Sequence, residues 1–434
     1  MTDASARRRP SPSLELGRRL EVTLTEHAFG GESLGRDPDG RPVFVAYALP
    51  GEVVSIDVTE AHPTWSRGRL VEVLQPSPHR VAPRCRHFAR CGGCHYQHMT
   101  YQAQLQAKAD VLATQFARLG GMKDLPLRPI IAAPHPWNYR NHLQFGLTAG
   151  GRLTFQATAS SEGIPIEECH LPEPALADLW PRLDLAPHSP IERVSLRAGS
   201  TGEALIAMHA VGAPAVELET SDEASVVWLG DGGPVVMAGE GRVEYAVSGR
   251  SFSVSAGSFF QVHTALLEPL VGLVMESLAP RRGEVIFDLY AGVGLFSAFV
   301  AATGATVVAV EESPSACADF ERNLADFDVS LYTTTVEQAL PSLAPSPDAV
   351  LVDPPRSGLS RPALEALAAQ APSRLVYVSC DPSTLARDAR RLSAFGYILQ
   401  HITTIDLFPQ TYHLESVSLW ARGSRRPDLE ELST

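Results

Sequence analysis

One stretch of the sequence, LVYVSCDPSTLARD at residues 375–388, places a cysteine where chemistry could be done. An apolar run ends at Cys380, a turn follows at 381–382, and helix-forming residues begin at Ser383. Parallel sheets present ligands at the carboxyl ends of their strands, so a thiol there could act as a nucleophile. A free cysteine is also among the most buried residue types. The stretch alone therefore leaves packing and catalysis open.

A second group of cysteines indicates metal or redox chemistry. Three of the six cysteines fall in the short run CRHFARCGGC, as Cys85, Cys91 and Cys94, and glycines 92–93 let the backbone fold between two of them. Cys169, in IPIEECHL, is the candidate fourth ligand. Both zinc and a cubane iron–sulfur cluster take four ligands. Zinc would be favoured if a histidine replaced a thiolate, and the candidates are His87, His95 and His98.

A glycine turn indicates a nucleotide-like ligand. In FDLYAGVGLFS, Asp288 ends an apolar run, and Gly292 and Gly294 form a turn before a helix, where polar groups can approach the backbone. Glu311 ends the next apolar run, about 20 residues on, where an acid can bind both ribose hydroxyls. Asp353, in LVDPPRSGL, ends a further run, and the two prolines after it stiffen the backbone.

The elements that must position these residues form three regions. Short alternating runs over residues 15–75, separated by turn residues, predict a small β-barrel of the OB type. A helix near 100–120 should end at Gly120 and Gly121, and mostly antiparallel strands should follow over about 135–262. From 265 onward strands alternate with helices, which predicts a doubly wound, mostly parallel sheet closed by an antiparallel hairpin at one edge.

Composition limits the class of protein. The chain has 434 residues, 44% hydrophobic, with a net charge of −13, which is typical of a globular protein of two or three domains. No apolar run is long enough for a membrane span, and the N-terminal residues lack an apolar signal core, so we expect a cytoplasmic protein. Residues 65–145 hold eleven Lys or Arg and three Asp or Glu, which indicates either a polyanion-binding face or simply a basic solvated surface.

Taken together, these motifs resemble a known family. The chain is similar, over about residues 15–422, to the S-adenosylmethionine-dependent RNA uracil-5-methyltransferases, and specifically to the bacterial 23S rRNA branch with a TRAM domain and a [4Fe-4S] cluster. The resemblance depends on GGESLGR, VAYALPGE, C-x5-C-x2-C with a distant cysteine, SFFQV, DLYAGVGLFS, DPPRSGL, VSCDPSTLARD and FPQTYHLESV, in that order. It implies a disordered tail (1–14), a TRAM barrel (15–76), a central domain with the iron–sulfur loop (77–264) and a Rossmann-like methyltransferase domain (265–434).

The resemblance also implies roles for single residues. Cys380 would attack uracil C6, and Glu415 would remove the C5 proton. The cofactor set would be Gln261, Asp288, Tyr290, Gly292, Gly294, Glu311 and Asp353. The cluster ligands would be Cys85, Cys91, Cys94 and Cys169, which favours iron–sulfur over zinc. Two positions depart from the family pattern: His263 stands where Asn is more frequent, and Thr335 where an acid often contacts adenine.

The reaction implied by the resemblance explains why a cysteine would stand at the end of the first stretch's apolar run. Uracil C5 is too weak a nucleophile to take a methyl group unaided, and a thiolate added at C6 makes it nucleophilic. We therefore expect the pKa of the Cys380 thiol to be lowered, aided by the amino end of the following helix. The expected partner is RNA, namely 23S rRNA, with tRNA as the alternative substrate. The protein is expected to act as a monomer and to bind no membrane. A catalytically inactive RNA-binding protein is the alternative from another class.

Overall fold

The computed structural model describes residues 15–212 and 224–423, so the predicted disordered tail, residues 1–14, lies outside the described residues. By compactness the described chain forms two units. The first contains residues 15–89, Gly93–Val111 and Gln410–Tyr412, and the second contains Arg90–Gly92, Leu112–Pro409 and residues 413–423. Within the described residues, no helix is both long and apolar enough to cross a membrane.

The first unit contains a closed five-stranded barrel in the order β1-β2-β3-β5-β4. Its strands are β1 (Arg19–His27), β2 (Glu32–Arg36), β3 (Pro42–Ala46), β4 (Val53–Ala61) and β5 (Ser66–Gln75). Alternate residues of β1 are buried, because one face of the strand turns into the barrel. Gly35 and Gly68 permit tight closure: a Cβ at these positions would lie 2.4 Å from Val22 and 2.3 Å from Ile56. The predicted small barrel is confirmed.

The helix predicted near 100–120 is α1 (Tyr101–Gln115), continued by one π-helical turn (Phe116–Gly120). Gly121 ends it in the left-handed conformation, with φ of 72°, and its N–H donates to the carbonyl of Phe116. The Gly120-Gly121 pair therefore terminates the helix as predicted.

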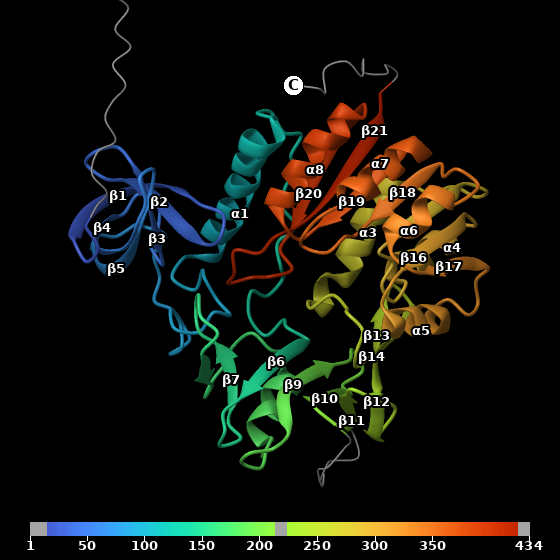
Figure 1. Ribbon diagram of the computed structural model, residues 1–434, viewed down its shortest axis with the longest axis horizontal. Helices are drawn as coiled ribbons and strands as arrows, with labels where there is room; N and C mark the ends of the chain where they lie inside the picture. Colours follow the sequence, from blue (N-terminus) through green and yellow to red (C-terminus); the bar gives the residue numbers. More distant parts are fainter. Residues whose placement is uncertain (1–14, 213–223, 424–434) are drawn as a thin grey trace, which may run out of the picture. The chain divides into compact units, whose positions relative to one another are not determined.

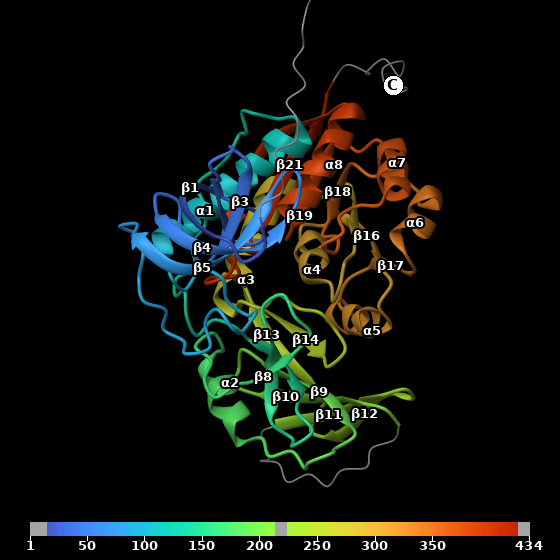
Figure 2. The same cartoon turned by 60° about the vertical axis from the view of Figure 1, so that its left-hand side comes forward.

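The second unit contains a seven-stranded central sheet in the order β12-β11-β10-β9-β6-β7-β8 (Figures 1 and 2). Its pairs are antiparallel except β10–β11, which is parallel. One face packs against α2 (Pro174–Leu179). The strands are β6 (His142–Leu147), β7 (Leu153–Gln156), β8 (Gly163–Pro165), β9 (Ile191–Ala198), β10 (Ala204–Ala210), β11 (Ala224–Gly230) and β12 (Gly233–Ala238). A separate hairpin, β13 (Arg242–Val247) and β14 (Arg250–Ser255), follows.

The C-terminal part is a second seven-stranded sheet with helices on both faces, in the order β17-β16-β15-β18-β19-β21-β20 (Figure 1). The strands are β15 (Val285–Leu289), β16 (Thr306–Glu311), β17 (Val329–Thr333), β18 (Ala349–Val352), β19 (Arg374–Ser379), β20 (Tyr397–Ile405) and β21 (Glu415–Arg422). The helices are α3 (Leu267–Leu278), α4 (Leu295–Ala302), α5 (Pro314–Asn323), α6 (Val336–Ala339), α7 (Arg361–Gln370) and α8 (Pro382–Ala394). The five parallel strands and the antiparallel edge hairpin are as predicted.

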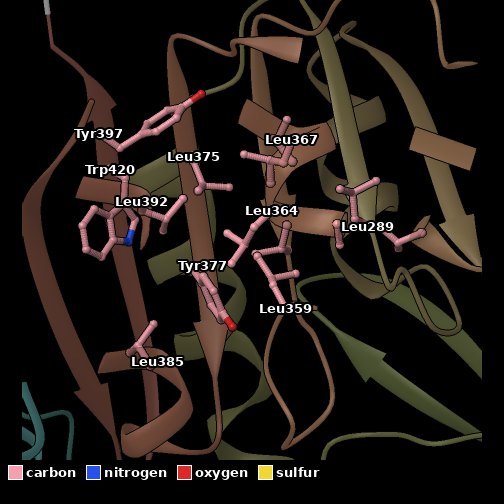
Figure 3. Close-up of a cluster of buried hydrophobic side chains, with 14 of the residues drawn as sticks. Leu289, Leu359, Leu364, Leu367, Leu375, Tyr377, Leu385, Leu392, Tyr397 and Trp420 are labelled. Carbon is pink, nitrogen blue, oxygen red and sulfur yellow. The ribbon is translucent and has the colours of Figure 1, made fainter. Parts of the chain in front are cut away.

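One face of this sheet is held by a large apolar cluster (Figure 3). Leu364 and Leu367 of α7 and Leu392 of α8 pack onto the strands, and Trp420 of β21 is fully buried beside them. The indole N–H of Trp420 donates to the Ser418 hydroxyl at 2.9 Å, so its one polar atom is satisfied. Burial of this face fixes α8, and hence the residues that precede α8, against the sheet.

Replacing Trp420 with alanine should lower the free energy of unfolding by about 3–5 kcal/mol, because a large buried side chain would leave a cavity. Thermal unfolding followed by far-UV circular dichroism measures the effect. Ile398→Ala, on neighbouring β20, is the control: that side chain is 57% exposed, and the change should stay within about 0.5 kcal/mol. Equal stability of the two variants would contradict the role of this cluster.

Candidate active site

The ends of four strands meet at one edge of the C-terminal sheet. Parallel strands β15, β18 and β19 end there at residues 289, 352 and 379, so Tyr290, Asp353 and Cys380 follow directly at the same edge. Strand β21 runs antiparallel to β19 and therefore begins at this edge, with Glu415 as its first residue. The topology thus brings residues from distant parts of the chain to one rim.

The pairing of β19 with β21 sets Cys380 beside Glu415. Ser379 pairs with Ser416, so the next step of the register places Cys380 across from Glu415. Directly opposed residues of antiparallel strands lie about 4.5–5.5 Å apart at their Cα atoms. The Ser416 hydroxyl also donates to the carbonyl of Ser379 at 3.3 Å, which supports the register at this point.

The electrostatic setting of Cys380 contradicts the expectation of a lowered pKa. Burial, then the neighbouring Glu415 and Asp353, raise the pKa of the Cys380 thiol to about 12, and only Arg356 acts in the opposite direction. The helix amino end cannot compensate, because the carboxylate of Asp381 caps α8 and accepts its first free N–H groups. That carboxylate itself also raises the pKa of the thiol.

The two carboxyl groups beside Cys380 are also poor acids. Burial, and then the charge of Asp353, raises the pKa of Glu415 well above its ordinary value, while Arg356 opposes the shift. Glu415 is 3% exposed, and its Oε1 has no hydrogen-bond partner among the described residues. Burial and the charge of Asp288 raise the pKa of Asp353 to about 7. A buried carboxyl with a free oxygen and a raised pKa is suited to proton transfer.

These groups line a cavity of about 1030 Å³. Its wall includes Cys380 and Glu415 together with five of the seven residues expected at the cofactor site, namely Gln261, Tyr290, Gly292, Glu311 and Asp353. Thr335, one of the two departures from the family pattern, also lines the cavity. The catalytic candidates and the cofactor candidates therefore share one cavity.

Two expected cofactor residues, Asp288 and Gly294, are not brought to the cavity wall. Asp288 is 1% exposed and accepts a hydrogen bond from the Ser297 hydroxyl at 2.6 Å, so it fastens β15 to α4 beneath the turn. Gly294 has φ of 85°, and a Cβ there would lie 2.3 Å from Leu324. Both residues support the turn from below. The sequence motif does not distinguish such a supporting residue from one that contacts the cofactor directly.

Glu311 holds the glycine turn as well as lining the cavity. Its carboxylate accepts backbone N–H groups of Gly292 at 2.8 Å, Glu312 at 3.0 Å and Ser313 at 2.8 Å. Oε1 accepts two of these bonds and Oε2 accepts one, so Oε2 keeps a lone-pair direction for a ligand hydroxyl.

The segment that carries Gln261 is tied to α5. Buried Asp319 accepts the backbone N–H of Ser255 at 2.8 Å and the hydroxyl of Ser258 at 2.5 Å. Asn323, one turn later, accepts the N–H of Ser253 and donates to the carbonyl of Val293, inside the glycine turn. Side chains of one helix thus hold two walls of the cavity together.

A similar network holds the segment after Asp353. Fully buried Asp388 of α8 accepts the N–H of Leu359 at 2.9 Å and the hydroxyl of Tyr377 at 3.0 Å. The bond to Leu359 fastens the end of the DPPRSGL segment to the helix that follows Cys380. Arg356, from the same segment, lines the cavity. Sequence reasoning gave Arg356 no role, although its place three residues after Asp353 was the available signal.

The two departures from the family pattern have different outcomes. Thr335 lines the cavity and also caps α6, its hydroxyl accepting the N–H of Gln338. His263 does not line the cavity: it is 1% exposed and stacks on Tyr139 with 4.8 Å between ring centroids. Burial lowers the pKa of His263 to about 4, so it stays neutral.

The cysteine motif gives no metal centre in the described part of the chain. Across residues 15–212 and 224–423, no group of three or more His, Cys, Asp or Glu side chains is arranged to hold a metal ion. Cys85 and Cys94 belong to the first unit, and Cys91 and Cys169 to the second. The metal centre stays a prediction from sequence.

Part of the basic zone is neutralised by acids. Arg80 binds buried Glu52 at 2.6 Å, and Arg67 and Arg69 of β5 bind carboxylates of the barrel at 2.7 and 2.6 Å. Each of these cations therefore has a carboxylate partner within the barrel unit. A local excess of Arg in the sequence therefore overstates the free positive charge.

Comparison with known proteins places the chain in a family. Residues 14–71 match the model for the TRAM domain, and residues 345–422 match the model described as tRNA (Uracil-5-)-methyltransferase. Proteins named as uncharacterized RNA methyltransferases from Thermosynechococcus vestitus and Streptomyces avermitilis are 32% and 33% identical. Each alignment covers 93% of this chain and 98% of the relative.

A solved structure has the same fold. The Pyrococcus abyssi tRNA (uracil-54, C5)-methyltransferase, in complex with S-adenosyl-L-homocysteine, is 22% identical and superposes with a TM-score of 0.72. The match covers 93% of this chain and all of that one. Because relatives named as RNA methyltransferases align with it almost end to end, the chain belongs to this family of RNA methyltransferases, and its residues 345–422 match the tRNA (Uracil-5-)-methyltransferase model.

Proposed function

We propose that this protein transfers a methyl group from S-adenosylmethionine to C5 of a uridine in 23S rRNA, through a covalent bond between Cys380 and uracil C6. The observation that carries the proposal is the juxtaposition of Cys380 with Glu415 at the wall of a cavity that also contains the glycine turn. A thiol and a buried base side by side suit an addition that must later be reversed by loss of a proton.

The residues of the cavity fit the cofactor. Tyr290 and Gly292 form the turn, Glu311 has acceptor capacity for ribose hydroxyls, and Gln261 and Asp353 supply polar groups on other walls. At Gly292 a Cβ would meet no atom within 4 Å, so the turn leaves space for a ligand against the backbone. When bound, S-adenosylmethionine supplies the electrophilic methyl group.

The protein's own residues carry the remaining steps. Cys380 gives up its thiol proton to solvent, and its sulfur forms a bond to C6 as the π electron pair of the C5–C6 double bond moves toward C5 and O4, which makes C5 nucleophilic. After C5 has gained the methyl group, the Glu415 carboxylate accepts the C5 proton. The electron pair of that C–H bond restores the double bond as the bond between sulfur and C6 breaks, which returns the thiolate.

Arg356 opposes, without cancelling, the unfavourable setting of the thiolate. It is the group that lowers the pKa of the Cys380 thiol, against burial and three carboxyl groups. A cation at this place stabilises both the thiolate and the negative charge that the uracil ring gains on addition.

The RNA substrate has two candidates. The TRAM barrel together with the cysteine motif supports 23S rRNA, and the name of the family model that matches residues 345–422 makes tRNA the second candidate. Mapping of 5-methyluridine in both RNAs, from cytoplasm of cells with and without the gene, decides between them. Loss of a 23S site supports the proposal, and loss confined to tRNA overturns that part of it.

The Cys380→Ala variant should neither methylate RNA nor form a covalent adduct, because no thiolate can add at C6. Glu415→Gln should still add and transfer the methyl group but should stall before elimination. It should therefore accumulate a methylated enzyme–RNA complex, visible as a retarded band on a denaturing gel with labelled RNA.

The matched control for the cysteine change is Cys317→Ala. Cys317 is buried on α5 and does not line the cavity, so methylation should persist. An RNA adduct with Cys380→Ala, or normal turnover by Glu415→Gln without a trapped complex, would show that the assigned roles are wrong.

In the protein without ligands, iodoacetamide should alkylate Cys380 slowly, because a thiol whose pKa is about 12 is almost entirely protonated at neutral pH. The rate should rise about tenfold per pH unit between roughly pH 7 and pH 10. Mass spectrometry of the peptide that contains Cys380 measures it, with urea-denatured protein as the control. A rate that levels off near pH 8 in the folded protein would contradict the raised pKa.

From the C-x5-C-x2-C motif and the distant cysteine, the proposal includes a [4Fe-4S] cluster that Cys85, Cys91, Cys94 and Cys169 would hold and that would take no part in the methyl transfer. Anaerobically purified protein should be brown and contain about four irons per chain. Cys169→Ala should lower the iron content, whereas Cys317→Ala should not. Colourless protein with one zinc would exclude the cluster and leave the methyl transfer untouched.

A further inference from the structure

The central sheet has a second face that its apolar core does not use. Leu143 and Phe145 of β6 and Val194 and Leu196 of β9 point into the core against α2. Because side chains alternate along a strand, the residues between them point to the other face. These are His142, Gln144 and Gly146 of β6, Arg193, Ser195 and Arg197 of β9, and Leu205, Ala207 and His209 of β10.

Four polar residues of this face form a continuous strip across three strands. Gln144 is paired with Ser195, and Arg193 with His209. The Arg193 guanidinium lies 2.9 Å from His209 Nδ1, and His209 Nε2 lies 3.2 Å from the Ser195 hydroxyl. The amide of Gln144 donates to the same hydroxyl at 3.4 Å. We call Gln144, Arg193, Ser195 and His209 the central strip.

The direction of these bonds leaves mainly donors for a partner. Arginine can only donate, so His209 Nδ1 must accept and its Nε2 carries the proton. Burial, and then Arg193, lowers the pKa of His209, which favours this neutral form. The Ser195 oxygen accepts from His209 and Gln144, so its own O–H proton and the remaining N–H groups of Arg193 are left over. An acceptor-rich anion matches this set.

The charge of the face is positive. No Asp or Glu stands at the positions of β6, β9 and β10 that point this way. Arg193 is exposed, and the described residues give it no ion pair with an acid. Burial lowers the pKa of His142 to about 3, and the charged groups that add to the shift, Arg197, Arg140, His209 and Arg193, are all basic.

The central strip continues into the candidate active site. Arg140 and His142 line the cavity that contains Cys380 and Glu415. Gln144 is the next residue of β6 on the same face, and Gly146, paired with Arg193, is the one after. The face therefore extends from the cavity for about 13 Å along β6, at roughly 3.3 Å per residue.

We propose that the central strip is a docking surface for the sugar–phosphate backbone of the RNA strand beside the target uridine. This inference rests on the proposed function and adds a named surface on the central sheet to it. Phosphate oxygens are acceptors with negative charge, and side-chain donors of this kind position a strand without reading its bases. The surface holds the flanking strand while the uridine is turned out of its stack into the cavity.

The test uses full-length protein and a single-stranded oligouridylate, with binding measured by fluorescence anisotropy over a series of sodium chloride concentrations. Arg193→Gln should weaken binding and reduce the slope of log K against log salt by about 0.7, the value for one phosphate contact on a single strand. Arg193→Lys should keep the slope. In methylation assays, Arg193→Gln should raise KM for RNA and leave kcat and KM for S-adenosylmethionine unchanged.

Arg152→Gln is the matched control, because Arg152 is 62% exposed beside β7 of the same sheet and pairs with Glu167. Its affinity and salt slope should equal those of wild type. If Arg193→Gln does not fold, Gln144→Glu takes its place in the test. This change adds a negative charge at an exposed position of the central strip and should also weaken RNA binding.

The outcomes separate the two proposals, because binding is measured without methyl transfer. If wild-type protein methylates RNA and a folded Arg193→Gln or Gln144→Glu variant binds with wild-type affinity and slope, the docking surface is overturned and the function stands. If wild-type protein methylates no RNA while the variants lose affinity, the proposed reaction fails and the surface stands.

Discussion

The candidate site depends on a single strand pairing. Strand β21 is inserted antiparallel between β19 and β20, so the residue that begins it lies at the rim where the parallel strands end. In a wholly parallel sheet that position would lie at the opposite edge, away from every ligand-binding turn. A slip of one residue would also turn Glu415 to the other face of the sheet. The buried Trp420 on the same strand opposes such a slip, because its indole fits the apolar cluster in one register.

The charged forms of the acidic groups in the candidate site are unfavourable in the protein without ligands. Cys380, Glu415 and Asp353 are acids whose charged forms are destabilised by burial and by neighbouring carboxyl groups, which include Asp288 beside Asp353. In the protein without ligands these shifts favour the protonated forms, and Arg356 opposes the shift of the pKa at Cys380 and at Glu415. An environment that raises the pKa of a carboxyl also makes its carboxylate a stronger base. The same burial thus suppresses the thiolate of the resting protein and strengthens the base needed later.

Rigid polar networks, rather than the sheet alone, hold the walls of the cavity. Asp319 and Asn323 connect α5 to the segment before Gln261 and to the glycine turn, and Asp388 connects α8 to the segment after Asp353. Each of these side chains satisfies backbone N–H groups that no strand partner reaches. Buried carboxylates with several donors fix loop geometry more strictly than apolar contacts do, because hydrogen bonds are directional.

The sequence by itself determined the barrel, the parallel sheet with its edge hairpin, and the position of Cys380 at the end of a strand. These features follow from local patterns, namely the period of apolar residues, turn residues and helix stops, which need no knowledge of distant contacts. The proximity of Glu415 to Cys380 was implied only by resemblance, and the pairing of strands 35 positions apart in the chain decided it.

Tertiary structure alone decided the electrostatics. The predicted lowering of the pKa of Cys380 was wrong because a helix amino end is visible in the sequence, whereas burial and the approach of Glu415 are not. Asp288 and Gly294 belong to the expected motif but lie beneath the turn. Arg67, Arg69 and Arg80 are paired with acids that lie at a distance in the sequence. Charge and pKa depend on every group within several ångströms, and only the folded chain determines which groups those are.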